Sequence, residues 1–319
     1  MRGVFLDFDS LNPADLDLTA LRTCLTDWDF HHLSTPDQVA ARISTAQIVV
    51  TNKVPLDSAL IESAPDLKLI CVAATGTDNV DLTAARDAGV VVSNARDYAT
   101  ASVVEHVFML MFTLTRRLDD YRDRTRRGDW TGSPHFCLFD STINELAGKT
   151  LGVVGYGVLG QAVARMAEAF SMRVSIAQRL HGEPLPDRVP LQQLLETADI
   201  VSLHCPLTEQ TRGLIGAREL QSMKADAILI NTARGGIVAE KDLLQALKEE
   251  SIAGAALDVL EQEPPPASHP LVQYAAASSR LILTPHIAWA SRPARQRLVN
   301  EILANISAFM AGEPRNRVA

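Results

Sequence analysis

The sequence predicts an α/β protein built on two doubly wound parallel sheets. Strand-like and helix-like segments alternate through most of the 319 residues, and such alternation is typical of strands joined by crossover helices. A long helical pattern at 101–126 interrupts this alternation near the middle of the chain. The length also suits two domains, each with its own hydrophobic core. The chain is therefore expected to divide into two halves of the same class.

The first half is predicted to contain five strands and the helices between them. The run 67–73 is apolar throughout, which is typical of a parallel strand buried on both faces. Pro55 stands where a helix begins, and proline suits the first helical position. The expected strands are 4–8, 30–33, 46–51, 67–73 and 90–93, and the expected helices are 16–25, 36–43, 81–88 and one that begins at Pro55.

The middle of the chain is predicted to be one long helix over 101–126, followed by an irregular arm. The helix has a broad apolar face around Val107 in its first part and dense charge in its last part. Residues 128–145 show no periodicity, and a stretch of this length without structure is usually an arm or a functional loop. We expect residues 101–145 to form the interface of a homodimer.

The second half resumes the alternation and ends in a long helix. This last helix, 293–309, has no sheet of its own to cover, so we expect it to return to the first domain and make that domain discontinuous. The predicted domains are 1–98 with 289–319, and 99–288. The expected strands of this half are 151–154, 173–177, 200–204, 227–231, 253–259 and 281–284, and the expected helices are 161–170, 191–197, 217–223 and 240–249.

Three glycines follow the strand 151–154 in G-x-G-x-x-G spacing, directly before an apolar helical pattern. Glycine has no side chain, so it permits a tight turn, the approach of a pyrophosphate to the backbone, and close packing of helix on strand. The free N–H groups at the start of the helix also attract phosphates. In this context Gly155, Gly157 and Gly160 predict a dinucleotide-binding Rossmann domain.

The end of the next strand bears on the choice of cofactor. An enzyme that uses NAD usually has Asp or Glu there, bound to the adenosine ribose, but this chain has Gln178 followed by Arg179. One hypothesis is that Gln178 removes the repulsion of a 2′-phosphate and Arg179 pairs with it, so that NADPH is accepted. The alternative is that Gln178 binds the ribose of NADH while Arg179 points to solvent. NAD(H) and NADP(H) therefore both stay open.

Polar side chains follow three neighbouring strands of the second half. Arg234 follows the strand that ends at Asn231, Asp258 and Glu263 follow the next strand, and His286 follows the last. Ligands of open parallel sheets bind at the carboxyl ends of the strands. A guanidinium can hold a carboxylate with two hydrogen bonds, and a histidine beside a carboxylate can act as a general acid near neutral pH. These residues are the set needed to reduce a 2-keto acid with a hydride donor.

With these motifs in place, the chain resembles the D-isomer-specific 2-hydroxyacid dehydrogenase family over nearly its whole length. Each matching stretch is modest alone, but their order along the chain is specific. Within the family, Ala288–Ser291 and Glu313–Asn316 are similar to the glycerate (hydroxypyruvate) dehydrogenases. The matching stretches are Gly76–Asp81, Gly155–Gly160, His204–Leu207, Asn231–Gly236, Asp258 with Glu263–Pro264, and Thr284–Ala288.

The resemblance implies a role for each residue of the catalytic set. Arg234 would bind the substrate carboxylate and the 2-keto oxygen. His286 would donate a proton to that oxygen as hydride arrives from the nicotinamide. Glu263 would hydrogen-bond His286, orient it and keep it protonated.

The resemblance also implies the residues that surround the two ligands. It implies a discontinuous, flavodoxin-like substrate domain, in which the backbone amides around Thr75, Gly76 and Thr77 complete the carboxylate site. Trp289 either lines the substrate pocket or packs against the protein. Besides the glycine motif and the pair at the end of the second strand, the expected cofactor residues are Val158, Leu159, Cys205, Thr232, Ala233 and Asp258.

The family implies an oxidoreductase that interconverts a small 2-keto acid and its D-2-hydroxy acid. The favoured pair is hydroxypyruvate and D-glycerate, with glyoxylate and glycolate as the smaller alternative. A NAD(H)-sensing binding protein, like the corepressors of the family, stays open, as does a dehydrogenase for a bulkier 2-hydroxy acid. Formate dehydrogenase shares the fold, but it pairs a glutamine with its histidine, so Glu263 argues against it.

Composition excludes several other classes. The net charge of −8 argues against a nucleic-acid binder, and no apolar run approaches the length of a membrane span. The four cysteines are scattered without a C-x-x-C pair, which fits reduced thiols better than a zinc site or a disulfide framework. We therefore expect a cytoplasmic enzyme without a metal ion.

Overall fold

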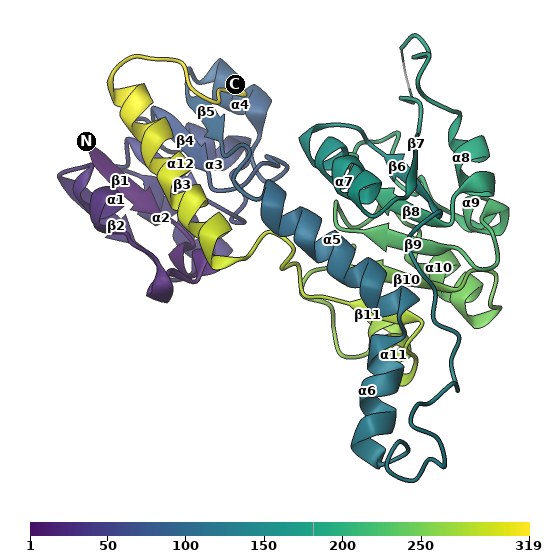
Figure 1. Ribbon diagram of the computed structural model, residues 1–319. Coiled ribbons are helices and arrows are strands. Elements are labelled where there is room, and N and C mark those ends of the chain that lie inside the picture. Colours follow the sequence, from purple (N-terminus) through teal and green to yellow (C-terminus); the bar gives the residue numbers. More distant parts are fainter. Residues whose placement is uncertain (181) are drawn as a thin grey trace. The chain divides into compact units, whose positions relative to one another are not determined.

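The computed structural model describes residues 1–180 and 182–319. The chain forms two compact units (Figure 1), Met1–Ala99 with Ala290–Ala319 and Thr100–Trp289. Each unit contains one parallel sheet with helices on its faces, which confirms the predicted fold class. The predicted domain limits, 98 and 288, lie one residue before the corresponding limits of the units.

The sheet of the first unit has the order β2-β1-β3-β4-β5, and all its strand pairs are parallel. This is the flavodoxin-like order. The central strands β3 and β4 are buried at every position, because helices cover both of their faces. The strands are β1 (Arg2–Phe5), β2 (Asp27–Phe30), β3 (Ile48–Thr51), β4 (Leu69–Val72) and β5 (Val91–Asn94).

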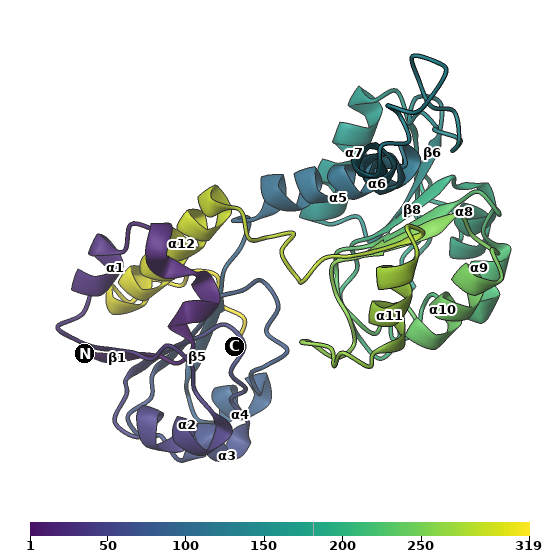
Figure 2. The same cartoon turned by 90° about the horizontal axis from the view of Figure 1, so that it is seen from below.

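Helices lie on both faces of this sheet (Figure 2). The helices α1 and α12 cover one face, and α2, α3 and α4 cover the other. Local capping fixes where several of them begin; the Asp81 carboxylate, for example, accepts the amides of Thr83 and Ala84 at the start of α4. The elements are η1 (Phe8–Leu11), η2 (Pro13–Asp15), α1 (Thr19–Thr23), α2 (Pro36–Ile43), α3 (Ser58–Glu62), α4 (Leu82–Asp87) and α12 (Arg292–Met310).

The last helix returns to the first unit, as predicted. Arg295 of α12 is 7% exposed and forms two hydrogen bonds with the Asp15 carboxylate, of 2.7 and 2.9 Å. The same guanidinium donates to the carbonyl of Asn12 at 2.7 Å. Farther along the helix, Asn305 donates to the carbonyl of Asn94 at the end of β5. The hydrogen bonds of the Arg295 guanidinium and of the buried Asn305 amide thus hold α12 in the first unit, although α12 is remote from that unit in sequence.

The sheet of the second unit has the order β11-β10-β9-β8-β6-β7, again with parallel pairs. The order reverses between β6 and β8, which makes their carboxyl ends the topological switch point where ligands of such sheets bind. The strands are β6 (Thr150–Val154), β7 (Arg173–Ile176), β8 (Ile200–Leu203), β9 (Ile228–Asn231), β10 (Gly254–Leu257) and β11 (Leu281–Leu283).

Helices also cover both faces of the second sheet (Figure 2). The helices α5 and α7 pack against each other on one face, and α8 to α11 lie on the other. The helices are α5 (Thr100–Thr115), α6 (Leu118–Arg127), α7 (Val158–Ala169), α8 (Leu191–Thr197), α9 (Ala217–Ser222), α10 (Glu240–Lys248) and α11 (Pro270–Ala277).

The prediction of a single helix over 101–126 is wrong, because the chain turns between α5 and α6. Arg117 adopts a left-handed backbone conformation with φ of 53°. The carbonyl of Thr115 accepts a hydrogen bond from the amide of Asn144, which returns from the arm and takes one of the last acceptors of α5. In addition, α6 has no buried residue, so no packing favours continuing the first helix.

Smaller differences concern element boundaries. The edge strand β2 lies three residues before its predicted position, because its partly exposed sequence gives a weak apolar signal. The strand β1 starts at Arg2 and ends at Phe5, earlier than predicted. The helix α7 starts at Val158, directly after the glycine turn, and α11 follows Pro270 where no helix was predicted.

Candidate active site

The turn after β9 presents Arg234. Asn231, the last residue of β9, is 1% exposed, and its side-chain amide bonds to the turn that follows. Its Nδ2 donates to the carbonyl of Arg234 at 2.8 Å, and its Oδ1 accepts from the amide of Ala233 at 3.0 Å. A buried asparagine therefore folds the chain back within three residues, which fixes the point from which the guanidinium extends.

The turn that carries Arg234 packs directly on the loop after β10. A Cβ atom placed on Gly235 would lie 2.0 Å from the carbonyl oxygen of Leu260, so the two backbones approach as closely as only glycine allows. Glu263 follows three residues after Leu260. The structure thus brings the turn with the predicted arginine and the loop with the predicted glutamate into contact.

Asp258 holds the turn after β11. It is 1% exposed, and its Oδ1 accepts from the hydroxyl of Thr284 at 2.6 Å and from the amide of Ile287 at 3.0 Å. Its Oδ2 accepts from the amide of Ala288 at 2.9 Å. Between these partners His286 adopts a left-handed conformation, with φ of 55°. The Asp258 carboxylate therefore fixes an uncommon backbone geometry at His286. Its predicted contact with the cofactor stays a prediction.

His106 of α5 joins this arrangement. Its Nε2 lies 3.0 Å from the hydroxyl of Thr284 and 3.5 Å from Oδ1 of Asp258. Burial lowers the pKa of His106, and the charge of Asp258 opposes that effect only in part. His106 therefore packs behind the histidine turn and supports it through Thr284.

Glu263 and His286 form a hydrogen-bonded pair. Oε2 of Glu263 lies 2.6 Å from Nδ1 of His286, and Oε1 of Glu263 accepts from the amide of Leu260 at 2.9 Å. The side chains of His286 and Glu263 are 25% and 34% exposed. A carboxylate on Nδ1 orients the ring, which leaves Nε2 as the nitrogen for a substrate oxygen.

The glycine turn after β6 lies at one wall of a cavity of about 500 Å³. Gly155 has φ of +94°, and a Cβ there would lie 2.5 Å from the amide nitrogen of Cys205. By contrast, a Cβ on Gly157 would have no neighbour within 4 Å among the residues that the structure describes, so these residues do not demand glycine at this position. Open space directly before the N-terminus of α7 is what a pyrophosphate requires.

Other residues predicted to bind the cofactor lie around the same edge. Cys205 lines the cavity, and burial raises the pKa of its thiol to about 11, so it meets a ligand as a neutral group. The hydroxyl of Thr232, in the turn after β9, is buried without a hydrogen-bond partner among the described residues. An unsatisfied buried hydroxyl at the carboxyl edge fits a polar ligand. The residues present therefore fit a dinucleotide.

Gln178 lines the cavity, but its amide is already bound to the chain. Its Nε2 donates to the carbonyl of Leu185 at 2.8 Å and to that of Arg188 at 3.2 Å. Its Oε1 accepts from the amide of Leu185 at 3.0 Å. The side chain thus fastens the loop that follows β7 onto the strand end.

Arg188 is a candidate that the sequence did not reveal. Its guanidinium carbon lies 5.6 Å from the ring centre of Tyr156, and Arg179 and Arg188 both line the cavity. Its Nε is buried and has no hydrogen-bond partner in the part of the chain that the structure describes. No sequence signal could place Arg188 here, because its position depends on the loop that Gln178 fastens.

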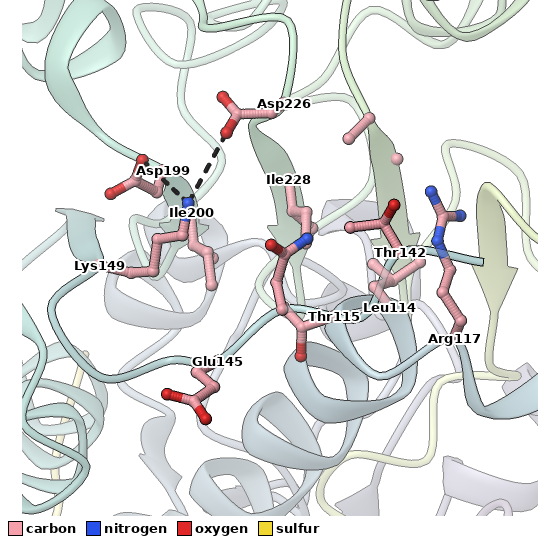
Figure 3. A pocket seen from close by; sticks show the side chains of 13 residues that line it. Leu114, Thr115, Arg117, Thr142, Glu145, Lys149, Asp199, Ile200, Asp226 and Ile228 are labelled. Carbon is pink, nitrogen blue, oxygen red and sulfur yellow. Dashed lines mark ion pairs between the residues drawn. The ribbon is translucent and has the colours of Figure 1, made fainter. Parts of the chain in front are cut away.

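A smaller cavity of about 150 Å³ lies at the opposite, amino edge of this sheet (Figure 3). Lys149 points between Asp199 and Asp226, at 3.7 and 3.6 Å. Partial burial would raise the pKa of Asp199, but the amide of Thr150 and the charges of Lys224 and Lys149 outweigh it and lower that pKa. This cluster is a network of ion pairs at strand starts, and it contains no predicted site residue.

The predicted substrate residues of the first unit follow β4. The hydroxyl of Thr75 donates to the carbonyl of Ala95 at 2.9 Å, and Nδ2 of Asn94 donates to the carbonyl of Thr75 at 2.7 Å. These bonds fix the start of the loop that continues through Gly76 and Thr77. Trp289 is the last residue of the second unit. The roles of these residues in substrate binding stay predictions.

The described residues contain no group of three or more His, Cys, Asp or Glu residues that could hold a metal ion. Among them there is also no helix that is both long and apolar enough to span a membrane.

The chain is similar to known proteins over most of its length. A family model for the NAD binding domain of D-isomer specific 2-hydroxyacid dehydrogenases matches residues 108–288. Glycerate dehydrogenase from Methylorubrum extorquens is 45% identical, over 95% of this chain and 97% of that protein. Hydroxypyruvate reductase from Blautia hydrogenotrophica is 35% identical, with 100% and 99% covered. An NADPH-dependent glyoxylate/hydroxypyruvate reductase from Sinorhizobium meliloti superposes with a TM-score of 0.83 at 27% identity, covering 100% and 97%.

A dinucleotide cavity and a carboxylate-paired histidine on one edge of a Rossmann sheet define a nicotinamide-dependent dehydrogenase. The chain belongs to the D-isomer specific 2-hydroxyacid dehydrogenase family. This finding confirms the resemblance, the enzyme class and the cofactor class, NAD(H) or NADP(H).

The two glycines of the turn should respond differently to an added methyl group. Gly157→Ala should cost less than about 1 kcal/mol of stability, because the new atom meets open space, but weaken NAD(P)H binding at least about tenfold. Gly155→Ala should cost at least about 2 kcal/mol, because of its positive φ and its contact with Cys205. Thermal unfolding and fluorescence titration of the cofactor measure both effects. Unchanged cofactor affinity in Gly157→Ala would place the pyrophosphate elsewhere.

Proposed function

We propose that this enzyme reduces a small 2-keto acid to its D-2-hydroxy acid, with hydroxypyruvate as the favoured substrate and glyoxylate as the smaller alternative. The observation that carries the proposal is the Glu263–His286 pair, in which Oε2 and Nδ1 lie 2.6 Å apart. The loop that presents Glu263 packs against the turn that presents Arg234. The relatives named glycerate dehydrogenase and hydroxypyruvate reductase support this substrate class.

His286 supplies the proton. The Glu263 carboxylate binds Nδ1 and orients the ring, so that a proton on Nε2 can be donated to the 2-keto oxygen. When bound, the reduced nicotinamide supplies the hydride that reaches the carbonyl carbon. After the transfer His286 is neutral and takes a proton from solvent; in the direction of oxidation it accepts the hydroxyl proton instead.

Arg234 binds the substrate. A guanidinium on a fixed turn offers two parallel N–H groups to the carboxylate and can also approach the 2-keto oxygen. Its positive charge stabilises the negative charge that develops on that oxygen in the transition state. The Asn231 amide keeps the turn in place during the reaction, so little reorganisation is needed.

We infer that the cofactor site accepts NADPH. Gln178 carries no charge that would repel a 2′-phosphate, and its amide is bound to Leu185 and Arg188 rather than left for a ribose. Arg179 and Arg188 both line the cavity, and Nε of Arg188 lacks an acceptor among the described residues. A phosphate between two guanidinium groups would supply that acceptor.

A homodimer through residues 101–145 is the expected assembly. The arm after α6 is held in shape by bonds such as that from Nε1 of Trp130 to the carbonyl of Phe136. Yet Phe136 and Phe139 are 90% and 86% exposed. Large aromatic side chains gathered on one exposed segment mark an interaction site, and a second copy of the chain is the partner we propose.

The four free cysteines agree with the expected cytoplasmic location.

Removing the acid should abolish most of the activity. The wild-type protein should oxidise NAD(P)H in the presence of hydroxypyruvate, and His286→Ala should lower kcat by about 10²–10⁴, the usual contribution of an acid–base group. His32→Ala is the control, because His32 also pairs with a carboxylate, that of Asp9, but on an exposed surface. Absorbance at the nicotinamide band measures the rate. An unchanged kcat in His286→Ala would remove this residue from the mechanism.

The same assay separates proton transfer from substrate capture. Arg234→Ala should reduce kcat/KM for the keto acid more than it reduces the affinity for the cofactor, because the proposed role of Arg234 is to bind the carboxylate of the keto acid. Unaltered kcat/KM would show that the carboxylate is held elsewhere.

Arg188 should contribute to the choice of cofactor. Arg188→Ala should reduce kcat/KM for NADPH at least about tenfold, the effect of a lost hydrogen bond between charged groups, and leave the value for NADH within about threefold. Arg173→Ala is the control, since Arg173 lies at the start of β7, whereas Arg188 lies in the loop that follows the end of this strand. An equal loss with both cofactors would show that Arg188 only supports the loop.

The dimer should depend on the exposed aromatic side chains. Light scattering at micromolar concentration should give twice the mass of the chain, and a double variant Phe136→Asp, Phe139→Asp should give the monomer mass, because charged groups would enter an apolar interface. His135→Asp, an exposed residue of the same arm, is the control. A monomeric wild-type protein would contradict the proposal.

A further inference from the structure

The loop that carries Glu263 is closed at both ends by one side chain, that of Glu240. Glu240 is the first residue of α10 and is not one of the residues predicted to form the site. Its Oε1 accepts a hydrogen bond of 2.7 Å from the amide of Glu261. Its Oε2 lies 3.1 Å from Nε2 of His269, at the other end of the loop. The Glu240 and His269 side chains are only 16% and 12% exposed.

The first of these bonds holds the peptide group between Leu260 and Glu261, directly after the one whose amide binds Glu263. The amide of Leu260 donates to Glu263, which in turn binds His286. The carbonyl of Leu260 belongs to the same peptide group as the amide of Glu261 and packs against Gly235. By holding the amide of Glu261, Glu240 therefore fixes the point where the loop with Glu263 meets the turn with Arg234.

Packing alone does not hold the loop on this side. A cavity of about 470 Å³ lies beside Glu240, and Glu261 and His269 also line it. The other charged groups around the cavity are Arg212 and Lys241. The ion pair of Arg212 with Glu261 spans 3.8 Å between side chains that are 60% and 61% exposed, so it is a weak restraint. The less exposed bonds of Glu240 are the stronger restraint.

We propose that Glu240 is a positioning residue for the catalytic acid, acting through Glu263 on His286. Pre-organised sites need their groups held within about 0.5 Å, and Glu263 stands on an irregular loop that the two bonds of Glu240 help to hold. The proposal rests on the proposed function, because His286 is taken to be the proton donor. Glu240 itself touches neither substrate nor cofactor in this account.

The test compares two substitutions of Glu240. Glu240→Leu removes both bonds and should lower kcat about tenfold, with KM for the keto acid and the affinity for NAD(P)H unchanged within about twofold. Reduction needs the protonated imidazole, so a weaker contact with Glu263 should also move the alkaline limb of the pH–rate profile to lower pH. Glu240→Gln keeps an oxygen for the amide of Glu261 and should retain most of kcat.

Asp242→Leu is the matched control. Asp242 also lies in α10 and also binds a backbone amide, that of Ala217 at 3.0 Å, but on a different loop. The Asp242→Leu variant should lose stability as Glu240→Leu does, but its pH–rate profile should match that of the wild type. Wild-type kcat and an unshifted profile in Glu240→Leu would overturn the proposal, as would changes that Asp242→Leu reproduces.

Two further measurements keep the test decisive. If Glu240→Leu does not fold, His269→Leu removes one of the two bonds and should shift the profile in the same direction by a smaller amount; no shift would overturn the proposal. If the wild-type protein reduces no 2-keto acid, the proposed function fails separately. The ring signals of His286, followed against pH by NMR in wild type and Glu240→Leu, then decide about the positioning role: identical titrations would contradict it.

Discussion

The buried carboxylate of Asp258 is the interaction on which the site depends. It is 1% exposed and accepts hydrogen bonds from Thr284, Ile287 and Ala288. An unpaired buried carboxylate costs several kcal/mol, whereas each hydrogen bond to a charged group contributes about 1.5–3 kcal/mol. The three bonds therefore make the burial tolerable, and they fix the backbone on both sides of His286.

Shielded polar side chains also hold the turn after β9 and the loop after β10. Asn231 folds the turn that presents Arg234, and Glu240 closes the loop that presents Glu263. Each side chain of the proposed catalytic set thus extends from a turn or loop that a shielded polar group holds. This explains how groups that remain partly exposed, as a substrate requires, can still be pre-organised. It also explains why function rests on loops while the parallel sheet serves as their scaffold.

The fold class could be predicted, and so could the placement of Glu263 beside His286, because their signals are local or geometric. Continuous apolar strands indicate parallel sheets, and residues that follow neighbouring strands of one sheet must share an edge. The break after Thr115, the binding of Gln178 to its own loop and the position of Arg188 could not be predicted. Each depends on a contact with a distant segment, such as the bond from Asn144 to Thr115, that no local pattern encodes.

The most direct test of the account is the identity and chirality of the product. Hydroxypyruvate should be incubated with the protein and NADPH or NADH, and the glycerate formed should be separated by chiral chromatography. The account predicts D-glycerate, in an amount equal to the NAD(P)H oxidised. L-glycerate would contradict the assigned arrangement of His286 and Arg234. Cofactor binding without turnover of any small 2-keto acid would contradict the proposed activity itself.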